Sequence, residues 1–196
     1  MKIRIGVNKR SVENAISKMQ EVKSILQKGI PQKELFEYIF SFFLERANFY
    51  LYQSQIGMAV KERIKSSWDC EITGKSLKIV NHYEKSVYVE FGVGIVGKAN
   101  QHEKAQAAGY EYDVPSPYKG LDGSWTFRSR DLSEMDLPMS DVTLTQKGDG
   151  GYWVTTLGTK GVMYAYNALM DVSMDLQNKN GVIATAWKQI LRRYLQ

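Results

Sequence analysis

One segment, residues 32–52, restricts the fold of this chain more than any other. Pro31 suits the first turn of a helix, and the residues after it keep helical spacing. The apolar side chains cover most of the circumference of that helix: Leu35, Phe36, Tyr38, Ile39, Phe40, Phe42, Phe43, Leu44, Phe49, Tyr50, Leu51 and Tyr52. A helix that is apolar on nearly all sides must be buried on more than one side.

Two arrangements satisfy that requirement. The helix is either sandwiched at the centre of one domain, or a second subunit covers its second side. For the second arrangement, the candidate residues of the subunit interface are Phe36, Phe40, Phe43 and Tyr50.

The patterns on either side of this helix predict an α+β protein. A short alternating strand is expected at 3–7, a hairpin at 68–82, and further strands at 124–128 and 152–156. A helix over 12–28 carries an apolar stripe made of Val12, Ala15, Ile16, Met19, Val22, Ile25 and Leu26. Helical spacing returns after 162, with a break at Gly181. We therefore expect N-terminal helices and a C-terminal helix packed on an antiparallel sheet with long loops.

The length of 196 residues suits a single domain spanning 1–196. Two polar stretches rich in turn residues, 98–123 and 129–150, are expected to be loop excursions. We expect the first excursion to contribute to subunit contacts and to become ordered on assembly.

The composition argues against several kinds of active site. Cys70 is the single cysteine, which fits a reducing compartment, and neither His82 nor His102 has the spacing of metal ligands. The carboxylates fall at helical intervals, so we expect no metal, no cofactor, no small-molecule substrate and no catalysis. Charged residues interrupt the most apolar segment, and the first residues lack the core of a signal peptide. We expect an unexported protein without a membrane span.

A glycine-rich segment at 87–98 offers nucleotide binding as a hypothesis. Gly92, Gly94 and Gly97 have the spacing of a dinucleotide fingerprint, and Gly97-Lys98 resembles the end of a phosphate-binding P-loop. The run before the glycines is expected to be a strand, yet it carries Glu90 and no βαβ pattern follows. Ala99 stands where a P-loop needs a hydroxyl for Mg²⁺. Both nucleotide interpretations are therefore weak.

The same segment carries a resemblance to a known family. Residues 88–94 read Tyr-Val-Glu-Phe-Gly-Val-Gly, which resembles the Tyr-Val-Glu-Phe-Gly-Thr-Gly motif of lambdoid tail-completion proteins. These are minor tail or head–tail joining (neck) proteins of long-tailed phages. The likeness covers about 30–195, including Gly123-Ser-Trp125 and the glycine-rich approach 158–161 to the C-terminal helices. Val93 replaces the family's Thr, and its Pro-Phe pair before the last helix is absent.

The motif makes physical sense without a ligand. Gly92 and Gly94 permit positive φ and a sharp reversal, while Tyr88 and Phe91 supply apolar surface. Glu90 would either cap backbone amides or pair with a Lys or Arg of a neighbouring subunit. We expect a stiff corner.

The resemblance implies a structural protein of a phage or prophage virion. It implies a homo-oligomeric ring, for which six-fold symmetry is expected, between connector proteins and the tail tube. Such a protein would reside in the tail or neck of the virion, and in the host cytoplasm during assembly.

A basic nucleic-acid-binding module of mobile-element origin is the alternative. The net charge is +5, and the basic candidates are Lys2, Arg4, Lys9, Arg10, Lys61, Arg63, Lys65, Lys188, Arg192 and Arg193. No helix-turn-helix, zinc-finger or single-strand-binding motif accompanies them. Non-specific contact with DNA in the lumen of a ring would draw on the same charge.

Overall fold

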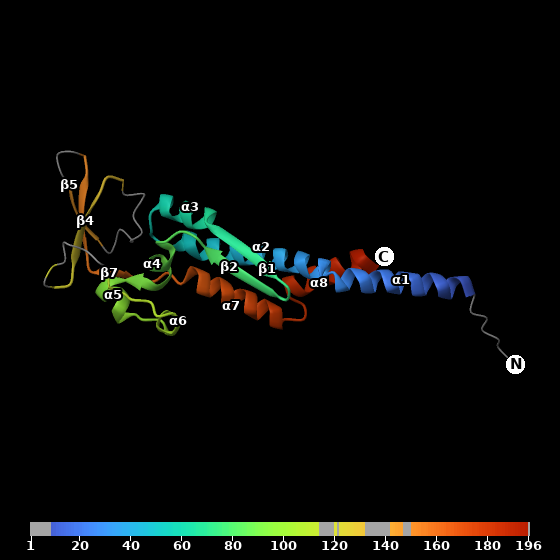
Figure 1. Cartoon of the computed structure of the whole chain (residues 1–196). Coiled ribbons are helices and arrows are strands. Elements are labelled where there is room, and N and C mark those ends of the chain that lie inside the picture. The colour runs from blue at the N-terminus through green and yellow to red at the C-terminus, as the bar shows by residue number, and fades with distance from the viewer. Residues whose placement is uncertain (1–8, 114–119, 121, 132–141, 147–149, 196) are drawn as a thin grey trace.

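A computed structural model describes residues 9–113, 120, 122–131, 142–146 and 150–195. The strand expected at 3–7 lies outside them. The described chain is an elongated α+β molecule: a three-stranded sheet stands at one end, helices fill the middle, and α1 projects at the other end (Figure 1). The α+β expectation is confirmed.

The helices form the main body around α2 (Ile30–Gln53). Helix α1 (Lys9–Gln27) precedes it, and Gly29 with a φ of 70° separates the two. Helices α3 (Met58–Ser66), α7 (Tyr164–Gln177) and α8 (Val182–Leu195) all contact α2. The predicted break at Gly181 is confirmed, since α7 ends at Gln177 and α8 begins at Val182. The side chain of Asp175 caps the start of α8 by accepting the amides of Val182 and Ile183 at 2.9 and 2.8 Å.

Helix α2 is buried on several sides by its own chain. One row of its residues, Ile39, Phe43, Ala47 and Leu51, lies in the main core with Tyr164, Ala168 and Val172 of α7. Phe43 is 4% exposed, so a partner cannot reach it and we remove it from the candidate interface. Phe36, Phe40 and Tyr50 are half-buried, and their assignment to an interface stays a prediction.

The predicted hairpin is confirmed and consists of β1 (Trp68–Thr73) and β2 (Ser76–Asn81). Trp68 pairs with Asn81 and Thr73 with Ser76, and Gly74 turns with a φ of 57°. The hairpin covers α2 through Trp68, whose ring meets that of Phe43 edge-on at 5.1 Å.

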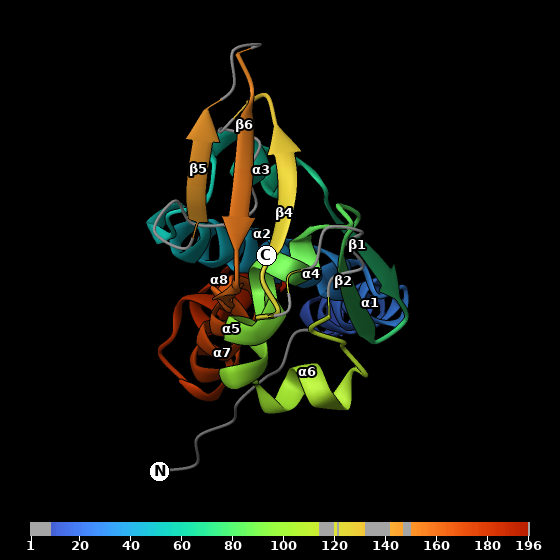
Figure 2. The same cartoon turned by 90° about the vertical axis from the view of Figure 1, so that its left-hand side faces the viewer.

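The remaining described strands form two further small sheets, not one. Strands β4 (Trp125–Ser129), β6 (Tyr152–Thr156) and β5 (Val142–Gln146) lie in the order β4-β6-β5 (Figure 2). Strand β3 (Gly92–Val93) pairs with β7 (Gly158–Lys160). The pairings between these described strands are all antiparallel.

Three local predictions were wrong. The run before the glycines is helix α4 (Ser86–Phe91), not a strand. The first excursion includes the end of α5 (Gly94–Ala99) and all of α6 (Glu103–Ala107), where His102 caps α6 by accepting the amide of Lys104. Strand β5 lies within the second excursion, because β6 offers it a partner edge that local sequence does not reveal.

Candidate functional site

The motif forms a tight double reversal of the backbone, which we call the glycine corner and define as residues 88–97 with 158–161. Gly92 follows α4 with a φ of 82°, Val93 is extended, and Gly94 opens α5 with a φ of 70°. Only glycine adopts such positive φ values without strain. The expected positive φ values at Gly92 and Gly94 are confirmed.

Backbone packs on backbone across this corner. A Cβ at Gly158 would lie 1.9 Å from the carbonyl oxygen of Val93, and one at Gly92 would lie 2.3 Å from that of Thr159. At Gly94 a Cβ would lie 2.4 Å from the ring of Trp125. The glycines therefore provide close approach as well as positive φ.

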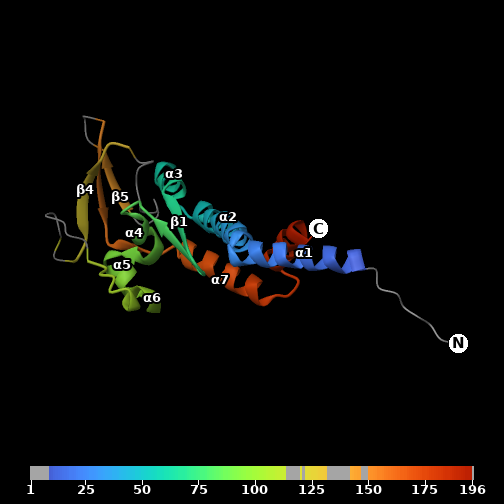
Figure 3. The ribbon, with the colours of Figure 1, turned by 45° about the vertical axis from the view of Figure 1, so that its right-hand side comes forward.

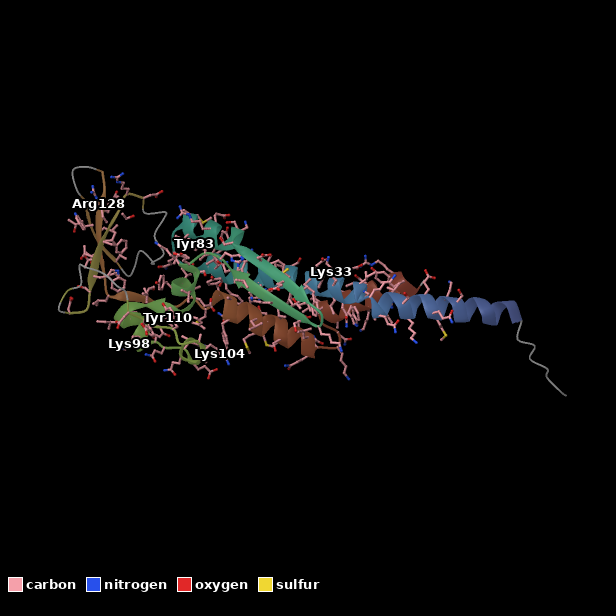
Figure 4. All side chains as sticks on the ribbon, viewed as in Figure 1. Lys33, Tyr83, Lys98, Lys104, Tyr110 and Arg128 are labelled. Atoms are coloured by element: carbon pink, nitrogen blue, oxygen red, sulfur yellow. The ribbon has the colours of Figure 1, made fainter. Side chains whose placement is uncertain are left out.

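This geometry leaves no phosphate cradle. The amide of Gly94 donates to the carbonyl of Tyr112 at 2.7 Å, and that of Val96 donates to Leu157 at 3.3 Å. A phosphate site needs such amides free at a helix N-terminus. Lys98 is exposed at the outer edge of α5 (Figure 4), and α5 follows a two-residue antiparallel strand instead of a buried parallel one.

Glu90 joins the corner to α7. Its Oε2 accepts the amide of Ala165 and its Oε1 accepts the amide of Tyr166, each at 2.8 Å. The amide of Met163 donates to the Glu90 carbonyl at 3.0 Å, and Met163 itself has a φ of 57°. Of the two roles expected for Glu90, the structure shows amide capping, at the positive end of the α7 dipole.

Burial raises the pKa of the Glu90 carboxyl, and the bonds from the α7 amides oppose that shift. A raised folded-state pKa means that the folded protein keeps the proton at a pH where the unfolded chain has lost it. We therefore expect the stability of the wild type, relative to Glu90→Gln, to increase as the pH falls from neutral toward about 4.3, the unfolded value. Urea unfolding of both proteins at several pH values measures this difference. A difference that grows as the pH rises would contradict the assignment.

An aromatic cluster holds the 102–112 segment against the corner. The ring of Tyr110 lies 5.4 Å from that of Phe91 and 4.8 Å from that of Tyr112. The Tyr110 hydroxyl donates to the Gly92 carbonyl at 2.5 Å, and burial raises its pKa (Figure 4). His102 packs on the ring of Tyr166 at 4.6 Å. The described part of the first excursion is thus tied to the corner within one chain.

Reactive side chains do not converge in the part of the chain that the structure describes. Cys70 is half-buried on β1, where burial raises the pKa of its thiol. His82 lies 3.8 Å from Asp69 with both side chains largely exposed. Within the described ranges, no three His, Cys, Asp or Glu side chains gather as metal ligands would.

Several of the basic candidates make contacts within the chain. Lys65 pairs with Glu62 at 3.6 Å, and the ammonium of Lys188 donates to the carbonyl of Lys179 at 3.2 Å. Lys61 is buried, and its ammonium donates to the carbonyls of Ser54 at 2.6 Å and Tyr52 at 3.3 Å, at the end of α2. Arg193 pairs with Glu34 at 2.7 Å.

Sequence reasoning missed the partners of the motif. Tyr110, Thr159 and Gly161 complete the corner from distant positions, and a Cβ at Gly161 would lie 2.3 Å from the Glu90 carbonyl. The glycine-rich run 158–161 was the available signal, since it indicates close packing without naming what it packs against.

No protein family, curated protein or solved structure was found to match the chain. Along the described residues, no helix has both the length and the apolarity that crossing a membrane requires.

Proposed function

We propose that the chain is a structural virion protein of a tailed phage or prophage, a head–tail connector or tail-completion subunit. In this proposal it forms a homo-oligomeric ring and catalyses no reaction. The observation that carries this proposal is that the residues of the motif make their contacts with other parts of the same chain. Both carboxylate oxygens of Glu90 hold α7, and the space beside Gly92 and Gly94 is filled by the chain's own atoms. A rigid corner is what a ring subunit needs from these residues.

The uncovered apolar surface also supports assembly. Large apolar side chains are exposed on α1 and on α7, and the two helices lie in different parts of the molecule (Figure 1). A cyclic ring with head-to-tail contacts needs two different complementary surfaces on each subunit. We propose connector proteins and the end of the tail tube as the further partners, with non-specific DNA contact in the lumen. The location that follows is the virion neck or tail, and the host cytoplasm during assembly.

Mass photometry and negative-stain electron microscopy of the purified chain test this function. We expect closed rings, six-fold in symmetry, whose population grows with protein concentration. A monomer at every concentration that bound DNA with a strong salt dependence would contradict ring assembly and favour the nucleic-acid-binding alternative.

A further inference from the structure

Helix α1 presents two large apolar side chains, Met19 and Leu26, that its own chain leaves exposed. It contacts the body near its C-terminal end, through α2 and α8, and projects beyond them in two views (Figure 1 and Figure 3). Met19 is 74% exposed and Leu26 is 48% exposed. These residues lie seven positions apart, so they share one face of the helix, as in a coiled-coil seam. Most of the stability of a helix in a protein comes from packing of its apolar face, so covering these two side chains would stabilise α1.

Helix α7 presents a second uncovered apolar face. Tyr164, Ala168 and Val172 point into the core, and the opposite face carries Leu169, Met170, Met174 and Leu176. These four side chains are between 42% and 58% exposed. Leu169 and Leu176 are again seven positions apart, the spacing at which side chains of one helix pack against a neighbouring helix. Contiguous exposed apolar surface is a common feature of interaction sites, and these four side chains gather on one helix.

The charges of α1 argue against covering Met19 and Leu26 by parallel pairing of two copies of this helix, and those of α7 permit docking on α7. If two copies of α1 paired in parallel, Lys18 of one would flank Lys23 of the other, and like charges there oppose pairing. Helix α7 has no Lys or Arg. Its two acidic residues face inward: Asp171 accepts from Arg46 at 2.5 Å, and Asp175 caps α8. The outer face of α7 thus carries exposed apolar side chains and no charge, and it does not repel the lysines of α1.

We propose that α1 of one subunit docks on the outer face of α7 of a second copy of this chain. One such contact covers both uncovered faces at once, whereas pairing of α1 with α1 leaves α7 exposed. The contact joins two different surfaces, so it repeats around a ring. The inference rests on the proposed ring assembly and identifies the interface that builds it.

Two double variants test the contact. Met19→Lys with Leu26→Lys disables the α1 surface, and Leu169→Lys with Met174→Lys disables the α7 surface. We expect each variant to be monomeric at concentrations where the wild type is assembled, with subunit affinity reduced roughly 100-fold or more. All four positions are well exposed, so both variants should fold, which circular dichroism checks. Met58→Lys is the matched control, because Met58 is 53% exposed on α3, outside both surfaces, and this variant should assemble normally.

Mixing the two double variants gives the decisive result. Each keeps the surface that the other lacks, so an equimolar mixture should form dimers and nothing larger in mass photometry. A mixture that stays monomeric, or an α7 variant that assembles like the wild type, would overturn the inference. In the second case wild-type rings would still form, and the proposed function would stand. A wild type that never assembles would refute the ring and the docking contact together.

Discussion

Replacing Gly158 by alanine is expected to destabilise the protein more than any other single substitution in the glycine corner. The residue has a φ of 105°, and a Cβ would lie 1.9 Å from the carbonyl oxygen of Val93. Both the Cβ and the atom it meets are fixed by the backbone, so no side chain can rotate away. We expect a loss of more than about 4 kcal/mol in the free energy of unfolding. Urea unfolding followed by tryptophan fluorescence measures it.

A glycine elsewhere separates the clash from the backbone strain. Gly109 has a φ of 67°, and nothing lies within 4 Å of its Cβ position. Gly109→Ala should therefore cost about 1 kcal/mol, the strain alone. Equal losses for the two variants would contradict the close packing of Gly158 on Val93, because they would mean that the corner opens to admit a methyl group.

These glycines show what the sequence can and cannot predict. Gly92 and Gly94 indicate a reversal because few other residues take positive φ. The strand they contact, β7, begins at Gly158, and nothing local to Gly92 points to it. The sequence therefore predicts a corner but not its second half.

Helix α4 shows how tertiary contacts override local preference. Val87 and Val89 favour a strand, and the strand prediction based on that preference is wrong. As a helix, the segment buries Val89 and brings Glu90 to the amides of Ala165 and Tyr166. Those partners lie 75 and 76 positions along the chain, beyond the reach of any local pattern.

Periodicity predicts the long helices well, but it does not identify what buries them. The pattern of 32–52 demands burial on more than one side, and α2 has it. Periodicity records that a face is apolar and not which surface covers it. The assignment of Phe43 to an interface is wrong for that reason, because Trp68 and the main core take it up.

Glu90→Ala is expected to have the second-largest effect, because the Glu90 side chain links the corner to the start of α7. The substitution removes two charge-assisted bonds and leaves the amides of Ala165 and Tyr166 without their acceptor. We expect a loss of about 2–4 kcal/mol in the free energy of unfolding. The loss is not larger because, in the wild type, the cost of burying the carboxyl offsets part of the stabilisation that these bonds provide. Urea unfolding measures the loss.

Amide hydrogen exchange localises that effect. Ala165 and Tyr166 should lose protection in Glu90→Ala, while amides in the β1–β2 hairpin should follow only the global change. Glu103→Ala is the matched control, because Glu103 lies in the first turn of the exposed helix α6 and should cost less than about 0.5 kcal/mol. If both variants were equally stable, Glu90 would not be holding α7. The motif would then need another reason to carry a buried acid, and pairing with a cation from a neighbouring subunit would become the better account.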